Sequence, residues 1–241
     1  MGRHLQKGFT VIEVMLVLAI TSLMLSAVLN NSSRRVNEQH YREGVESFRD
    51  FLAGTFEDID SVKNDVLGQI KRCNSSPFAG DNTVAWRGSA ECFYSGREVT
   101  ITYDRSSGST KLTSRSVKAF IDPSGATEPQ YIAVMDAREA NLREQDIDWG
   151  VGAMQPKPHS NNGYSNYKMR IIRNPKSGAK IFQIQDSAGG AWRTPENNII
   201  FCMKNPFYND NQWQMVTVDK NAINSSGITT NNGRDSCGVN T

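Results

Sequence analysis

The sequence predicts an α+β protein in which one long N-terminal helix packs on a C-terminal domain built around an antiparallel sheet. Three patterns lead to this fold class. An almost uncharged stretch covers residues 9–29, apolar residues then recur every three or four positions as far as Ile70, and alternating segments begin at Glu98. The first two patterns are typical of helix and the third of strands. We therefore expect a helix over residues 9–72 and a globular domain over 73–241.

The apolar stretch of residues 9–29 forms the first half of the expected helix. At 1.5 Å per residue it is about 32 Å long, enough to cross a bilayer. Glu13 is its single charged residue. A carboxylate near the bilayer core costs about 2.5–3.5 kcal/mol, so we interpret Glu13 as a functional residue. Arg3 and Lys7 precede the stretch and predict that residues 1–8 stay in the cytoplasm.

Residues 30–72 form the second, amphipathic half of the helix. We expect its apolar face to pack against the globular domain of the same chain, with a partner helix as the alternative. That face comprises Tyr41, Val45, Phe48, Leu52, Phe56, Ile59, Val62, Val66 and Ile70. Asn30, Asn31, Ser32 and Ser33 compete for backbone hydrogen bonds, and Gly44, Gly54 and Gly68 lower helix propensity further. The helix is therefore not expected to be uniformly rigid.

The globular domain begins with a connecting loop and continues as strands. Glu98–Tyr103 and Lys111–Arg115 alternate around a turn and predict a hairpin. Residues 136–148 have a helical composition and residues 150–163 are expected to be a loop. Further strands are expected at 131–135, 167–173, 180–185, 198–203 and 212–218. The polar tail from Asn221 is expected to be mobile unless a disulfide holds it.

All four cysteines follow the apolar stretch, at Cys73, Cys92, Cys202 and Cys237. An even count in this position favours disulfides in an oxidising space outside the cytoplasm. No pair has the CxxC spacing of a structural zinc site, so we expect no metal. Four cysteines allow three pairings, and we favour Cys73–Cys92 and Cys202–Cys237 because both close local loops. Each bridge is worth about 3–4 kcal/mol in chain-entropy models.

Signals of catalysis are weak. Three histidines are present, and HExxH, GxSxG and Walker motifs do not occur. We therefore expect no enzymatic activity and no cofactor. Two weaker hypotheses remain: Asn209, Asp210, Asn211 and Asp219 supply oxygen atoms of the kind that bind calcium, and Trp192, Phe207, Tyr208 and Trp213 offer an exposed adhesive patch. Turn residues and core aromatics explain the same positions without any ligand.

The N-terminus resembles the type IV prepilin signature: a basic leader, Gly8, then Phe9 and Thr10, Glu13, and an apolar helix. This resemblance covers residues 3–29 and implies a type IV pilin, minor pilin or pseudopilin. It implies that a prepilin peptidase cuts between Gly8 and Phe9 and that the new terminus is methylated. An ordinary secretory signal peptide or a plain membrane anchor is the rival interpretation, and neither explains Gly8-Phe9 or Glu13.

The resemblance also implies function and location. Phe9 would supply a cationic terminus that pairs with Glu13 of a neighbouring subunit, so that residues 9–29 bundle at a filament centre. The expected partners are other pilin subunits, the peptidase, an inner-membrane assembly platform and membrane lipid before assembly. The globular domain would lie outside the cytoplasm and later on an extracellular or periplasmic filament. Loss of Arg3 and Lys7 would leave 25 basic against 25 acidic residues, so nucleic-acid binding is not expected.

The chain length of 241 residues favours a minor pilin or a pseudopilin of a type II secretion or DNA-uptake system. The alternative class is a monomeric, membrane-anchored binding module that resembles an adhesin. Many major pilins carry a helix-loosening proline after the apolar half, whereas this chain has no proline before Pro77. Residues 30–33 stand at that place and are expected to be the point at which the helix yields.

Overall fold

A computed structural model describes the main elements of the chain. It covers residues 10–60, 70–71, 84–85, 92–104, 109–120, 130–133, 142–147, 151–153, 167–174, 176–185, 190–204, 213–232 and 237. The chain divides into two compact units, residues 1–42 and 43–241. Helix α1 (Val11–Asp60) contributes to both. A long N-terminal helix followed by antiparallel sheets confirms the expected α+β class.

Helix α1 is continuous through residues 30–33, so their low helix propensity does not interrupt it. The expected end at residue 72 is wrong. Ile70 and Lys71 form the short strand β1, which pairs antiparallel with β2 (Val84–Ala85). The apolar spacing continued to Ile70, but a β-branched residue close after Gly68 fits a strand equally well. Val62 and Val66 lie outside the described residues.

The larger sheet has the strand order β5-β4-β3-β8-β9, and β6 also pairs with β4. The strands are β3 (Cys92–Asp104), β4 (Ser109–Phe120), β5 (Gln130–Ala133), β6 (Arg143–Ile147), β8 (Tyr167–Arg173) and β9 (Lys180–Gln185). All pairs in it are antiparallel. The expected hairpin is confirmed, since Glu98 lies opposite Arg115 and Thr102 opposite Lys111.

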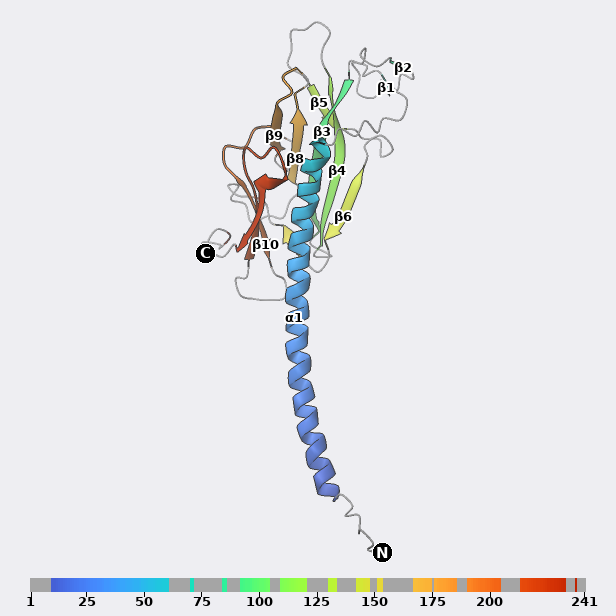
Figure 1. Cartoon of the computed structure of the whole chain (residues 1–241), viewed down its shortest axis with the longest axis vertical. Coiled ribbons are helices and arrows are strands. Elements are labelled where there is room, and N and C mark those ends of the chain that lie inside the picture. The colour runs from blue at the N-terminus through green and yellow to red at the C-terminus, as the bar shows by residue number, and fades with distance from the viewer. Residues whose placement is uncertain are drawn as a thin grey trace, which may run out of the picture. The chain divides into compact units, whose positions relative to one another are not determined.

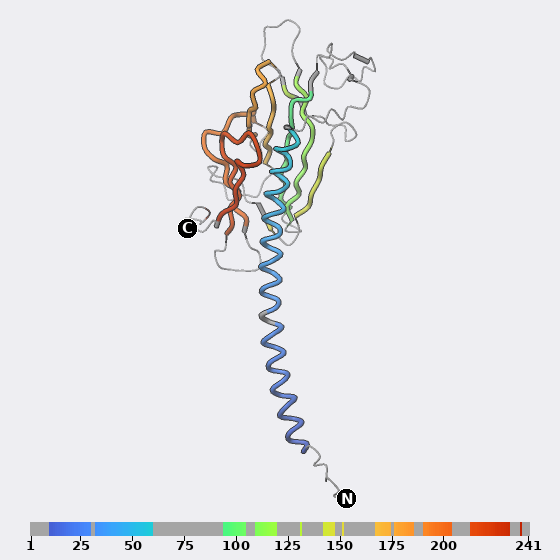
Figure 2. Tube along the Cα trace, in the orientation of Figure 1, coloured from blue at the N-terminus to red at the C-terminus, as the bar shows by residue number. Residues whose placement is uncertain are grey.

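The β8–β9 hairpin is also confirmed, and its strands can be followed in Figure 2. Its turn follows from local chemistry. The Asn174 side chain accepts hydrogen bonds from the backbone of Lys176 and Ser177. Gly178 has a φ of 71°, a left-handed conformation that glycine adopts without strain. The turn thus sets the register of the two strands.

The expected helix at residues 136–148 is wrong where the structure describes it. Arg143–Ile147 is β6, which pairs with β4 from Ser114 to Thr110. Composition favoured helix, but both ends of this segment pack inward: the Arg143 guanidinium lies 5.1 Å from the Phe51 ring centroid, and Ile147 is buried. Pairing with a neighbouring strand therefore outweighs intrinsic propensity.

A second sheet has the order β12-β11-β10-β7. Its strands are β7 (Gly152–Ala153), β10 (Ile199–Lys204), β11 (Trp213–Val218) and β12 (Ile228–Asn232). Strands β10 and β11 match expectation, whereas β7 falls in a segment expected to be loop and β12 in the tail expected to be mobile. Ile228 gives β12 a buried anchor at 2% exposure, and β12 pairs with β11 over five positions.

The core of the second unit forms where residues 43–60 of α1 meet both sheets (Figure 1). Phe48 contacts Phe201 of β10 edge-on at a centroid distance of 5.2 Å, and Phe56 lies 6.0 Å from Phe182 of β9. Both helix residues are essentially fully buried. The apolar face of the helix thus packs on the chain's own sheets, as expected.

Two glycines of α1 serve this packing. A Cβ atom at Gly44 would lie 2.9 Å from Val151, and one at Gly54 would lie 2.7 Å from the Arg143 guanidinium. From the sequence, these glycines were expected only to weaken the helix locally. The structure shows a second role at Gly44, where the missing side chain leaves room for Val151, the residue directly before β7.

Candidate functional site

The N-terminus of α1 is closed by a reciprocal pair, Thr10 and Glu13. The Glu13 Oε2 atom accepts hydrogen bonds from the Thr10 backbone nitrogen at 2.9 Å and from its hydroxyl at 3.0 Å. The Glu13 backbone nitrogen donates to the Thr10 hydroxyl at 3.3 Å. This arrangement is a capping box, which satisfies backbone donors that the first helical turn leaves without partners. The sole carboxylate of the apolar stretch therefore has a defined local task.

The capping box was missed in the sequence, although its signal was present. A Ser or Thr followed three residues later by Glu or Gln, just before an apolar run, is the usual signature. Thr10-Val-Ile-Glu13 has this spacing.

The helix surface that follows is apolar and exposed. The large apolar side chains from Val11 to Leu29 are 45% to 76% exposed. The hydroxyls of Thr21 and Ser22 donate to carbonyl oxygens one turn earlier, at Val17 and Leu18. This segment is long and apolar enough to span a membrane. An unbroken apolar surface of this size marks a place for lipid or for other helices.

The second pair of expected cysteines forms a disulfide between Cys202 of β10 and Cys237. Both residues are buried in a cluster with Trp213, against which Ile200 and Met215 pack. The bridge attaches the end of the tail to the second sheet. Cys73 lies outside the described residues, so the Cys73–Cys92 bridge remains a prediction.

The adhesive patch loses one member in the structure. Trp213 is 9% exposed and belongs to the disulfide cluster. Trp192 is half-buried, with the Arg170 guanidinium 4.1 Å from its ring centroid. Phe207, Tyr208 and the residues Asn209 to Asn211 lie outside the described part of the chain. Within the described residues, no cluster of metal-binding side chains occurs.

Arg170 organises a polar cluster on the larger sheet. Its Nε donates to the Gln183 side chain at 2.9 Å and its Nη1 to the Tyr131 carbonyl at 3.3 Å. Burial lowers the pKa of Arg170 to about 10 and raises the pKa of Glu98, its cross-strand neighbour. These contacts tie β5, β9 and the segment of Trp192 together. The cluster stabilises the sheet and uses its charged groups internally.

Gly8 and Phe9, the expected processing residues, lie outside the described residues. Thr10 and Glu13 are thus the described part of the candidate site, together with the exposed apolar surface that follows. The structure brings Glu13 to the first turn of the helix, close to the position at which a new amino terminus would arise.

Comparison with known proteins agrees with this arrangement. Residues 3–29 match the family model described as the prokaryotic N-terminal methylation motif. This motif is the signature of type IV pilins and pseudopilins, so the chain carries the N-terminus of that class of structural subunits. The search of curated proteins and the search of solved structures found no match. The motif and the apolar helix fit membrane anchoring before assembly.

Proposed function

We propose that the chain is a structural subunit of a type IV pilus or a related pilus-like filament. The observation that carries the proposal is the methylation motif leading directly into an apolar, exposed helix with a single carboxylate. A subunit of this kind is held in the membrane before assembly and polymerises through the same helix. The globular residues from 73 onward would then face outward.

The proposed assembly contact joins Glu13 of one subunit to the Phe9 amine of its neighbour. Leaving a charge unpaired in an apolar surrounding is costly. Pairing the Phe9 amine with the Glu13 carboxylate there therefore lowers the free energy more than an exposed ion pair does in water. The capping box is compatible with this contact. A carboxylate accepts about four hydrogen bonds, and two of those at Glu13 go to Thr10. Capacity therefore remains for an incoming ammonium group.

Processing is the first test. Mass spectrometry of the mature protein should find an N-terminal Phe9 with an added methyl group. Gly8→Val should leave residues 1–8 attached, because the peptidase would no longer find its glycine. A mature terminus beyond Ala27 would instead identify an ordinary secretory signal peptide.

Assembly is the second test. Glu13→Val should insert into the membrane and enter sheared surface filaments much less than the wild-type chain. Thr21→Val is the matched control, since it removes a polar group from the same helix but not the carboxylate. Normal incorporation of Glu13→Val would refute the proposed pairing.

Processing by a prepilin peptidase and contact with other pilins follow from the motif. The proposal also includes an assembly platform as partner and the exact membrane topology. It further includes the division of the chain into leader, span and domain at residues 8, 29 and 72. The helix itself ends before Ile70, where strand β1 begins. A minor pilin or pseudopilin remains the favoured subclass on chain length. A monomeric binding module would show no filament-associated chain after shearing, even with correct processing.

A further inference from the structure

The edges of the two sheets differ in how they are protected against pairing with another chain. An edge strand has unpaired backbone groups, and proteins usually protect it with charged residues, a short length or a covering segment. Strand β9 is covered, because Ile184 exchanges backbone hydrogen bonds of 2.9 and 3.0 Å with Arg193. Strand β6 carries three charged residues, and β5 and β7 are only four and two residues long. Four of the edge strands are therefore protected.

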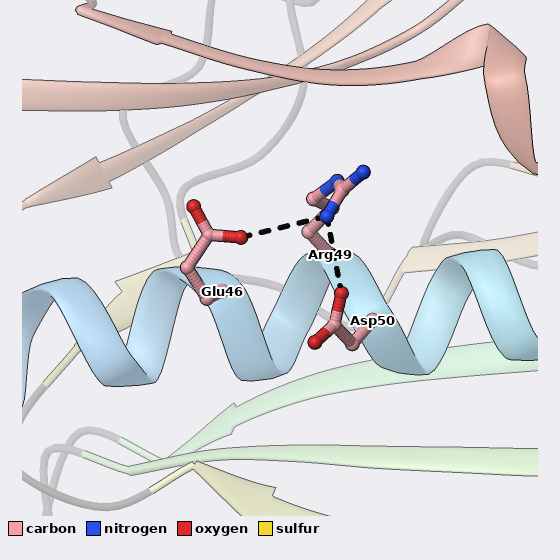
Figure 3. Close-up of polar contacts among 3 residues, drawn as sticks. All are labelled: Glu46, Arg49 and Asp50. Carbon is pink, nitrogen blue, oxygen red and sulfur yellow. Dashed lines mark hydrogen bonds and ion pairs between the residues drawn. The ribbon is translucent and has the colours of Figure 1, made fainter.

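Charged residues also occupy the outward face of α1, and they satisfy one another within the chain. Figure 3 shows the Arg49 guanidinium between two carboxylates, 3.6 Å from Glu46 and 3.3 Å from Asp50. The Glu46 and Asp50 side chains are 54% and 68% exposed, so water solvates the rest of each carboxylate. Two copies of this surface would meet with like charges, which is unfavourable. We therefore do not interpret this face as a contact between equal copies.

Strand β12 has none of these protections. Its sequence, Ile228-Thr-Thr-Asn-Asn232, contains no charged residue and no proline. It pairs with β11 in regular register over five positions, and no described strand pairs with its other side. In an antiparallel pair, alternate residues direct their N–H and C=O groups away from the partner strand. Two or three residues of β12 therefore offer backbone hydrogen bonds on the side opposite β11.

A second copy of β12 is complementary to this edge. Two copies that pair antiparallel over all five residues place Thr230 opposite itself and Thr229 opposite Asn231. No like charges meet in this arrangement, and threonine pairs across strands are favourable. The same arrangement of two β6 strands would place Glu144 opposite Asp146, so two carboxylates would repel each other. Self-pairing is thus suited to β12 and opposed by the charges of β6.

We propose that two copies of this chain associate through β12, with their β12 strands antiparallel and Thr230 at the centre. The second sheets of both copies then form one continuous sheet, to which each copy contributes four strands. Such a contact is isologous, so it closes on two copies. It goes beyond the proposed filament contact, which uses residues 9–29 and repeats from subunit to subunit.

The first test measures the dimer dissociation constant of the full chain by sedimentation equilibrium, with detergent micelles in large excess. Thr229→Lys with Asn231→Lys places lysines opposite each other at two positions and should raise the dissociation constant about tenfold or more. Thr229→Lys with Asn231→Glu is the matched control. It changes the same positions but places each lysine opposite a glutamate, so the dissociation constant should stay within about threefold of the wild-type value. The Cys202–Cys237 bridge reports correct folding of both variants.

The second test is cysteine cross-linking, which reports the register. Thr230→Cys should form an intermolecular disulfide rapidly under mild oxidation, because this residue lies opposite its equivalent in the second copy. Thr229→Cys should form one much more slowly, since its opposite residue is Asn231. Chains with Thr229→Cys mixed with chains with Asn231→Cys should again link rapidly. Non-reducing peptide mapping separates these links from exchange with the native bridge.

Weakening by the two lysines alone, together with rapid linking at Thr230→Cys, supports the inference. A monomeric wild-type chain overturns it, and so does equal weakening by both double variants with the Cys202–Cys237 bridge intact. Dimers that neither double variant changes would form through another surface, which also overturns it. Faster linking at Thr229→Cys than at Thr230→Cys would show a different register and refute the proposed pair. The proposed filament function fails separately, because pairing through β12 requires neither cleavage after Gly8 nor Glu13.

Discussion

Removal of the Cys202–Cys237 bridge should destabilise the globular unit by an amount that the structure allows to be estimated. The two cysteines are 35 residues apart in sequence. For a loop of this length the chain-entropy model gives about 4 kcal/mol at 25 °C, because the bridge restricts the unfolded chain. The double variant Cys202→Ala with Cys237→Ala should lose about this much free energy of unfolding. Alanine avoids burying two hydroxyl groups in the apolar cluster around Trp213.

The structure also indicates where the loss should appear first. Within the described residues, the tail is also held by five residue pairs between β11 and β12, by the buried side chains of Ala222 and Ile228, and by a hydrogen bond from Lys180 Nζ to the Ile223 carbonyl. The turn before β12 adds hydrogen bonds from Ser226 to the Asn224 side chain, which are exposed. These contacts are few compared with those of the larger sheet. Residues after Asn221 should therefore open before the rest of the unit.

The assay is urea unfolding of the full chain in detergent micelles, paired with limited proteolysis followed by mass spectrometry. The variant should show a lower midpoint and early cleavage beyond Asn221. Thr229→Ala is the control, since it changes an exposed side chain of β12 and leaves the bridge intact. A loss below about 1 kcal/mol, or first cleavage within α1, would show that the bridge does not limit the opening of the tail.

Four further outcomes are expected. Phe48→Ala should cost about 3–5 kcal/mol of unfolding free energy in urea titrations, because it removes a fully buried ring. Gly96→Ala should prevent normal folding, measured as lost protease resistance, since its Cβ would lie 1.9 Å from the Ile171 backbone oxygen. Burial raises the pKa of Glu98 above its usual 4.5, so the folded state binds its proton more tightly and stability should fall as pH rises through that raised pKa. Glu98→Gln should flatten this part of the pH profile. Thr10→Val should lower the helix content of the first turns in amide exchange, at a cost of about 1 kcal/mol, because the cap is lost.

The sequence predicted those parts of the fold in which local pattern and final environment agree. The apolar face from Val45 to Ile59 was predicted correctly, because apolar residues spaced by three and four positions define the buried face of a helix. The hairpin around Asn174 and Gly178 was predictable for a similar reason, since its turn chemistry is local. Each of these features is decided within about fifteen residues of sequence.

The errors lie where a distant segment decides the conformation. Arg143–Ile147 becomes a strand because β4 offers it a free edge, and no residue in the segment itself requires this. β12 was missed for the same reason, since Thr229, Thr230 and Asn231 acquire their conformation by pairing with β11. Of the candidate site, Glu13 was found from its charge. The capping role of Thr10 was missed because it depends on the spacing between Thr10 and Glu13 and not on either residue alone.

The contacts of Phe48 and Phe56 have a consequence for the order of events during synthesis. Their ring partners, Phe201 and Phe182, follow about 150 and 130 residues later in the chain. At 5–20 residues per second, synthesis reaches those partners roughly 7 to 30 s after the helix. During this interval the amphipathic half of α1 displays phenylalanines that have no sheet to cover them. A chaperone or the membrane surface must shield them, and cells lacking that protection should accumulate aggregated chains.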